Sequence, residues 1–180
     1  EWLYGNHHRV RDPVRGRLLI EAAAAAGSAV AVAWCKGAGW GGHAVDKKAS
    51  FDMYKKAAEQ GHSAAQSCVG VCYDTGNGVE EDRAEALKWY KKAAEQGYSG
   101  ALYNLGCCYD CGDGVEEDKA EALKWYRKAA EQGHSGAAYS LGLCHDYGYG
   151  VGADKAEAVK WYRKAAERGH GGAEQQLAAY

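Results

Sequence analysis

The sequence is poor in proline, phenylalanine and methionine, each of which occurs once. The single proline, Pro13, excludes collagen-like and polyproline segments, which need this residue at regular intervals. The longest uncharged apolar run, residues 22–35, is shorter than the roughly 18 residues of a membrane-spanning helix, so we expect no direct membrane span. The net charge of −2 gives no excess of basic residues, and we therefore expect no nucleic acid partner.

An initiator methionine is also missing, because the chain begins at Glu1. We expect a mature form or a fragment from which any targeting peptide has been removed. The compartment stays open, and an organelle or an extracytoplasmic space is compatible with the sequence. The length of 180 residues suffices for one domain, and we expect a soluble or peripheral protein.

Glycine and alanine, in contrast, are abundant, and 25 glycines are present. Most of them recur with a period of 36 residues, because residues 65–100, 101–136 and 137–172 align without gaps. Glycine at fixed places excludes a low-complexity linker and is typical of a repeat protein. Each copy predicts a first helix, a glycine turn, a second helix and a short loop.

The start of each second helix carries an aspartate followed three residues later by a glutamate. This spacing predicts a capping box, in which each side chain bonds the backbone N–H group of the other residue. The three pairs are Asp82 and Glu85, Asp118 and Glu121, and Asp154 and Glu157. The helices are expected to end at left-handed glycines, which are Gly97, Gly133 and Gly169. A glycine inside each first helix is expected to allow close helix contact; these are Gly70, Gly106 and Gly142.

The remaining segments are assigned by comparison with these copies. Residues 17–64 predict an N-terminal helix and a divergent first repeat with a rebuilt turn. Residues 1–16 are expected to form an extended N-terminal arm. Residues 173–180 supply only a first helix, which is expected to cap the stack.

The repeated pattern Ala-x-Tyr-x-Leu-Gly-x-x-Tyr-x-x-Gly-x-Gly-Val, Asp, Ala-x-x-Trp-Tyr-x-Lys-Ala-Ala-x-x-Gly resembles the Sel-1-like repeat, a relative of the tetratricopeptide repeat. The resemblance extends over residues 29–180, and His145 departs from it at a position where tyrosine stands elsewhere. It implies an all-α, right-handed α/α superhelical solenoid of helix pairs. It also implies a non-catalytic scaffold for protein partners.

Seven cysteines raise the question of disulfides or metal. Cys72, Cys108 and Cys144 are equivalent, and helices packed about 8–10 Å apart place such a column beyond the roughly 7 Å Cα separation of a disulfide. Some relatives rich in cysteine are expected to pair the two helices of a repeat, but here the second helices carry alanine. We interpret the cysteines as buried free thiols.

A thiol-based zinc module is the alternative, with ligands from Cys68-x3-Cys72 and Cys107-Cys108-x2-Cys111. The usual Cys-x2-Cys pairs are missing, which disfavours it. The acidic turn from Asp110 to Glu117 lacks the ligand spacing of a calcium loop and is interpreted as solvated charge. No catalytic motif is present, so we expect no enzyme and no cofactor.

A histidine recurs in the loop before three first helices, with tyrosine in the fourth slot. This exchange favours a packing role over catalysis. The residues concerned are His62, Tyr98, His134 and His170.

The first helices vary at positions spaced by three and four residues, which form one helical stripe outside the repeated packing positions. In solenoids of this kind the first helices line the concave face, so we expect these positions to form the partner groove. Drift on a solvated face and a purely architectural spacer are the alternatives. The stripe consists of Cys68, Val71 and Thr75; of Asn104, Cys107 and Cys111; and of Ser140, Leu143 and Tyr147.

Charge is distributed unevenly along the chain. Residues 1–64 carry nine basic and six acidic side chains (+3), whereas residues 65–136 carry eight basic and thirteen acidic ones (−5). The arm could therefore dock on an acidic partner, fold back on the repeats or remain disordered. Its candidate contact residues are Trp2, Tyr4, Arg9 and Arg11. We expect a protein partner within a multi-subunit complex.

Overall fold

The computed structural model describes residues 28–38 and 46–180, and this part of the chain contains helices and no strands. The expected arm, the helix expected before residue 27 and most of the rebuilt turn lie outside the described residues. The helices are α2 (Ala29–Ala38), α3 (Lys47–Glu59), α4 (Ser63–Thr75), α5 (Arg83–Glu95), α6 (Ser99–Cys111), α7 (Lys119–Glu131), α8 (Ser135–Tyr147), α9 (Lys155–Glu167) and α10 (Gly171–Leu177). The prediction of an all-helical repeat fold is confirmed.

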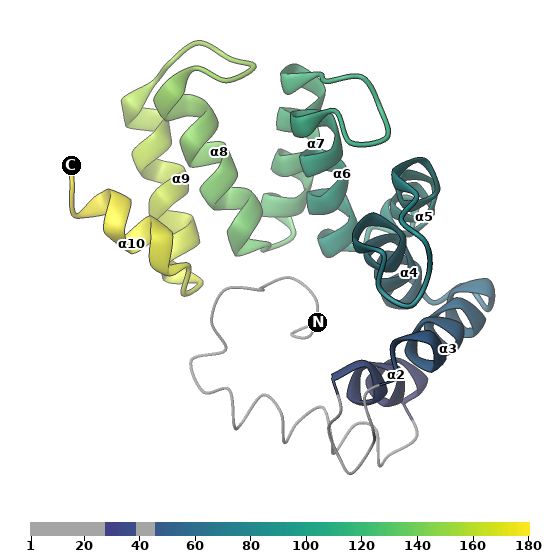
Figure 1. Cartoon of the computed structure of the whole chain (residues 1–180). Coiled ribbons are helices and arrows are strands. Elements are labelled where there is room, and N and C mark those ends of the chain that lie inside the picture. Colours follow the sequence, from purple (N-terminus) through teal and green to yellow (C-terminus); the bar gives the residue numbers. More distant parts are fainter. Residues whose placement is uncertain (1–27, 39–45) are drawn as a thin grey trace. The chain divides into compact units, whose positions relative to one another are not determined.

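The described helices belong to two compact units, which we describe separately. The first unit holds α2 to α5 and ends at Tyr98, and the second unit begins at Ser99 and holds α6 to α10. Within each unit a first helix and the following second helix pack together as a pair. The pairs are α2 with α3, α4 with α5, α6 with α7, and α8 with α9 (Figure 1).

Every second helix begins in the same way. The side chain of Asp118 accepts a hydrogen bond from the backbone N–H of Glu121 at 2.9 Å, which satisfies one of the free donors of the first turn. The same cap forms at Asp46, Asp82 and Asp154.

The second hydrogen bond of the predicted capping box, from the aspartate backbone N–H to the glutamate side chain, is wrong. The backbone N–H of Asp118 donates to the carbonyl of Tyr109 at 2.8 Å, and this bond ties the turn to the preceding helix. Glu121 instead pairs with Lys124 at 2.7 Å on the surface. The aspartate N–H already has a backbone partner, so the glutamate is left to interact with a nearby lysine.

The glycines inside the first helices face tyrosine rings of the second helices. A Cβ atom at Gly106 would lie 2.4 Å from the Tyr126 ring, and one at Gly142 would lie 2.3 Å from the Tyr162 ring. Gly70 faces Tyr90 in the same way. The predicted close approach is confirmed, and any side chain at these glycines would displace a buried ring.

The loops between repeats are held by stacked rings in the second unit. His134 stacks on Tyr103 with ring centres 4.5 Å apart, and its Nδ1 accepts a hydrogen bond from the backbone N–H of Ala137. His170 stacks on Tyr139 at 4.3 Å. Both histidines are buried, which confirms the predicted packing role, whereas His62 in the first unit is exposed.

The left-handed glycines at the ends of the second helices are also confirmed, with φ values of 76°, 94° and 80° at Gly97, Gly133 and Gly169. Within the described part of the chain, no helix combines the length and the apolar character that crossing a membrane would need.

Candidate functional site

The candidate stripe becomes more accessible along each first helix toward the glycine turn. In the second unit Asn104 and Cys107 are half-buried and Cys111 is exposed. The last repeat has the same gradient, with Ser140 and Leu143 half-buried and Tyr147 exposed. The accessibility of a stripe residue therefore depends on its position along the first helix rather than on its residue type.

In the first unit the stripe runs along α4. Thr75 is exposed, but Cys68 is buried and offers no surface to a partner. The expectation that the whole stripe lies outside the packing is therefore wrong for Cys68. The arm residues Trp2, Tyr4, Arg9 and Arg11 lie outside the described residues.

The middle of the stripe in the second unit is a polar cluster. The hydroxyl of Tyr126 donates to Cys107 Sγ at 3.6 Å and to Asp110 Oδ2 at 3.3 Å. Tyr103 on α6 adjoins this cluster, with its ring centre 5.8 Å from that of Tyr126. Burial raises the pKa of Cys107 and of both tyrosines, which keeps these groups neutral at physiological pH.

The repeated cysteines Cys72, Cys108 and Cys144 are buried, as expected. Cys68, one helical turn before Cys72, is buried as well. Burial raises the pKa values of Cys72 and Cys144 to about 11, so both are inert thiols at neutral pH. The expectation of burial is wrong for Cys111, which is exposed. Within the described part of the chain, none of these cysteines forms a disulfide, and neither does Cys107.

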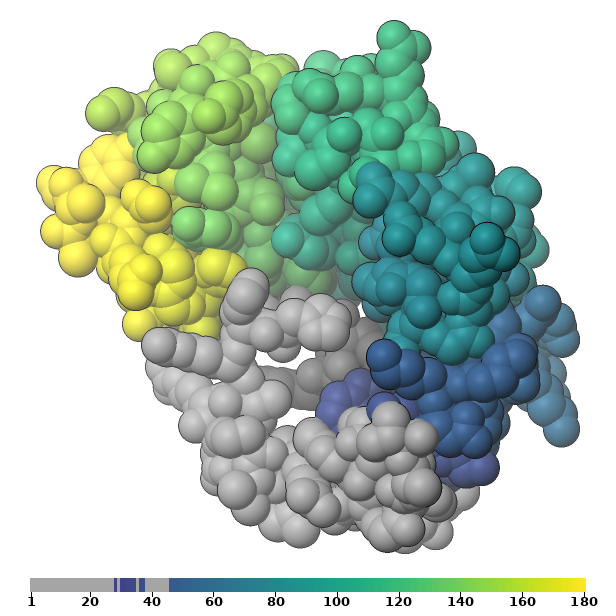
Figure 2. Space-filling view, in the orientation of Figure 1, coloured from purple at the N-terminus to yellow at the C-terminus, as the bar shows by residue number. Residues whose placement is uncertain are grey.

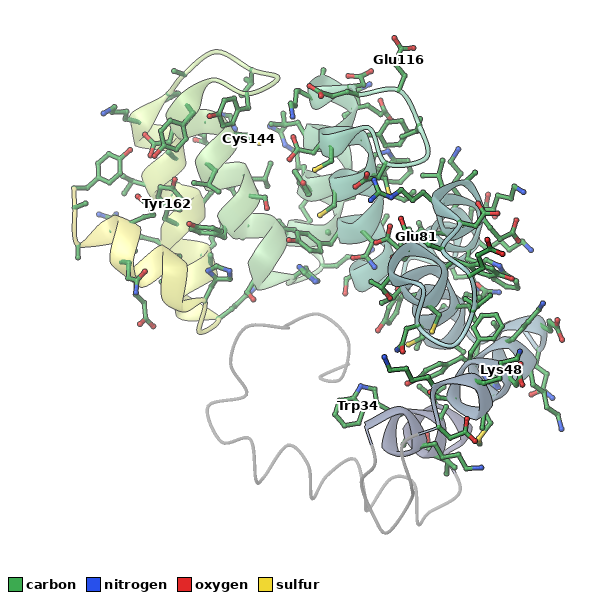
Figure 3. The ribbon with its side chains drawn as sticks, in the orientation of Figure 1. Trp34, Lys48, Glu81, Glu116, Cys144 and Tyr162 are labelled. Atoms are coloured by element: carbon green, nitrogen blue, oxygen red, sulfur yellow. The ribbon has the colours of Figure 1, made fainter. Side chains whose placement is uncertain are left out.

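The acidic turn between α6 and α7 is paired with the ammonium group of Lys119. Lys119 Nζ lies 3.2 Å from Asp110 Oδ1 and 3.4 Å from Glu117 Oε1, and the same ammonium group donates to the Asp110 carbonyl. Glu116 points away from the helices at the end of this turn (Figure 3). The turn stands out from the surface of the second unit in the space-filling view (Figure 2). Among the described residues, no group of three or more His, Cys, Asp or Glu side chains could hold a metal ion.

The turn after α8 presents aromatic side chains. Tyr147 and Tyr149 stack with ring centres 5.6 Å apart and an interplanar angle of 23°. The hydroxyl of Tyr180 donates to Asp146 Oδ1, and Tyr162 donates to Asp146 Oδ2 at 3.2 Å. The hydrogen bond to Asp146 raises the pKa of Tyr180 to about 12, because the bonded carboxylate disfavours a phenolate.

Sequence reasoning identified Tyr147 but missed Tyr149 and Tyr180. Tyr149 lies in the turn, beyond the end of the helical stripe. A comparison of equivalent turn positions could have found it, because Asn77 and Asp113 are the corresponding residues of the other copies.

The second helices form a different surface. In α5, α7 and α9 a tryptophan ring is covered by a lysine three residues later, at 4.3 Å for Trp125 and Lys128. The same contact occurs at Trp89 and Lys92 and at Trp161 and Lys164. This surface is alike in all three copies, whereas the first-helix stripe differs from copy to copy.

Solved structures of other proteins share this architecture. A protective antigen of uropathogenic Escherichia coli strains that displays an SLR fold is 39% identical, with a TM-score of 0.76; the match covers 89% of this chain and 35% of that chain. A Sel1 repeat protein from Oxalobacter formigenes is 34% identical, with a TM-score of 0.77 and coverage of 92% and 64%. The chain thus spans 35% and 64% of the lengths of these two proteins.

Cysteine rich protein B of Helicobacter pylori shares the fold at 24% identity, with a TM-score of 0.60, and the match covers 74% of this chain and 96% of that one. Among curated proteins, no sequence matches the chain. The Sel1 repeat profile matches residues 28–62, 63–98, 99–134 and 135–170. The chain therefore belongs to the Sel1 repeat family, whose members are generally non-catalytic modules for protein interaction.

Proposed function

We propose that the chain is an adaptor or an assembly subunit of a larger complex. It binds a protein partner through the stripe of its first helices and through its N-terminal arm. The stripe supports this proposal because its residues differ between copies whose helix caps and glycine contacts are the same. Varying residues that also reach the surface, such as Asn104 and Ser140, are available for binding.

The chemistry of the stripe suits a protein surface. Asn104 and Ser140 supply hydrogen-bonding groups, and Leu143 supplies apolar area beside the exposed Tyr147. Polar groups mixed with aromatic and apolar side chains are typical of protein interfaces. The arm residues Trp2, Tyr4, Arg9 and Arg11 belong to the proposal on the basis of the sequence, because aromatic and arginine side chains are favoured at hot spots.

Site-specific photo-crosslinking tests this proposal. A benzophenone amino acid is placed at Asn104 or Ser140 on the stripe, and at Lys124 or Lys160 on the second helices as matched controls. Both lysines are solvent-exposed on the outer helices. The four variants are crosslinked in extracts of the native source and compared by mass spectrometry.

We expect the same partner protein to be crosslinked from both stripe positions and from neither control position. Equal crosslinking from all four positions would indicate unspecific contact and contradict the proposal. Crosslinking from the second helices alone would move the binding surface to the other face. A third set of probes at Trp2 and Tyr4 tests the contribution of the arm.

A further inference from the structure

The stacked pair of Tyr147 and Tyr149 is unusual in its exposure. The two side chains are 58% and 52% exposed, and Tyr180 at 53% is the third exposed large hydrophobic residue in the described part of the chain. The two rings are nearly parallel and stack on each other, so each ring keeps its outer face for another molecule. Tyr147 is the last residue of α8, and Tyr149 lies in the turn between α8 and α9.

Other aromatic rings near the surface are covered by cations of the chain itself. A lysine lies over each tryptophan of the second helices, and Lys155 lies 5.8 Å from the Tyr180 ring centre. Within residues 28–38 and 46–180, no cation lies over Tyr147 or Tyr149. The pair thus offers two π-faces to a cation from another molecule.

The surroundings of the pair are acidic. Gly150, in the same turn, packs against the backbone of Lys119, so the α8–α9 turn lies next to the start of α7. Residues 110–119 and 146–155 together carry seven acidic and two basic side chains, a difference of −5. The two basic residues are engaged, Lys119 with Asp110 and Glu117 and Lys155 with the Tyr180 ring.

We propose that Tyr147 and Tyr149 bind an arginine side chain in a basic segment of the protein partner. A planar guanidinium group stacks on an aromatic face better than a compact, strongly hydrated ammonium group does. The acidic turn adds attraction at longer range and disfavours nucleic acid or an anionic membrane. This inference rests on the proposed function and adds the chemistry of the partner.

The repeats themselves supply a variant that tests the aromatic pair. Thr75 and Asn77 occupy the equivalent positions of the first complete copy, where the turn contains the same two left-handed glycines. The double substitution Tyr147→Thr and Tyr149→Asn therefore places residues from one natural turn into another. It removes both rings and leaves the net charge unchanged.

The test measures binding of a fluorescent peptide of alternating arginine and glycine to the full chain, by anisotropy at about 0.1 M salt. The same peptide with lysine in place of arginine is the chemical control. We expect the wild-type chain to bind the arginine peptide several-fold more tightly than the lysine peptide. The double variant should lose at least tenfold in affinity for the arginine peptide and should no longer distinguish the two peptides.

Two results would overturn the inference. The first is equal affinity of the wild type and the double variant for the arginine peptide, which would show unspecific attraction to acidic residues. The second is the absence of binding by the wild type. Concentration-dependent dimerisation in sedimentation, lost in the double variant, would likewise overturn it in favour of a second copy as the occupant.

A charge variant separates the contribution of the acidic turn. Glu116→Gly and Glu117→Ala introduce the residues that the last repeat has at these positions, Gly152 and Ala153. We expect a three- to fivefold loss for both peptides and a retained preference for arginine. A lost preference would contradict the role of the rings. If crosslinks form at Asn104 and Ser140 while the peptides fail to bind, the proposed function stands and only the arginine inference fails.

Discussion

The seam between the paired helices is the same in every copy, whereas the turns that join these helices differ from copy to copy. In the seam, Gly106 and Gly142 face Tyr126 and Tyr162 with almost the same geometry. In the turns, the middle copy has Glu116 and Glu117, while the last copy has glycine and alanine there and a tyrosine pair nearby. The comparison separates residues that build the repeat from residues that distinguish one repeat from another.

The physical reason lies in the space available. A buried ring that lies 2.4 Å from the position of a missing Cβ atom leaves no choice of residue at Gly106. The turn residues face water, and their backbone shape is already set by left-handed glycines such as Gly112 and Gly114. Exposed side chains in these turns, such as Glu116, can therefore change at little cost to the fold.

The largest expected effect is in the seam. Gly106→Val should destabilise the second unit by about 3 kcal/mol, because the added side chain would overlap the Tyr126 ring. Urea unfolding followed by circular dichroism measures the loss. Gly152→Val is the matched control, because a Cβ atom there has nothing within 4 Å. Equal stability of the two variants would contradict the comparison.

The second prediction concerns the buried loop at His134. Burial lowers the pKa of this imidazole to about 4, whereas the unfolded chain takes up a proton near pH 6.5. The unfolded state therefore binds more protons between these values, so stability falls as the pH falls from about 6.5 to 4. The expected loss is about 2–3 kcal/mol in the free energy of unfolding.

The His134→Tyr variant isolates this contribution, because Tyr98 occupies the same loop position after the preceding second helix. Urea midpoints of both proteins are compared at several pH values between 4 and 7. The variant should have a flatter pH dependence than the wild type. Parallel curves would show that the titration of His134 contributes nothing.

The third prediction concerns the relative contributions of Asp118 and Glu121 to the start of α7. Asp118→Ala should cost about 1 kcal/mol, because the N–H of Glu121 loses its acceptor. Glu121→Ala should cost about 0.5 kcal/mol or less, because only a surface pair with Lys124 is lost. Thermal melts of both variants provide the measurement. A comparable loss in both would restore the reciprocal capping box.

The smallest effect is expected in the turns. The double variant Tyr147→Thr and Tyr149→Asn should change the free energy of unfolding by less than about 0.5 kcal/mol, as is usual for exposed positions. Differential scanning calorimetry on the wild type and the variant compares the two. A drop of several degrees in Tm would show that the tyrosine pair is structural.

Much of the fold was predictable because the determinants repeat. Three copies of the same aspartate, glycine and alanine positions identify the helices without any tertiary information. The partners of Glu121 and of the Asp118 N–H were not predictable, because the competing carbonyl of Tyr109 lies in a different helix. Local sequence patterns do not include contacts of this kind.

The candidate site was predicted less completely. Helical periodicity identified the positions of Asn104, Ser140 and Tyr147 on one stripe, but it could not show that Cys68 is buried. Burial depends on the neighbouring helix rather than on the stripe itself. Tyr149 escaped because turn residues have no helical period.

One variant tests most directly the claim that the frame builds the fold and the stripe binds. Asn104→Cys, Cys107→Val and Cys111→Thr replace the stripe of the middle copy by that of the preceding copy, Cys68, Val71 and Thr75. The measurement is the affinity of the variant for the partner identified by crosslinking, on protein whose circular dichroism matches the wild type. We predict at least a tenfold loss of affinity. Wild-type affinity in a correctly folded variant would contradict the account.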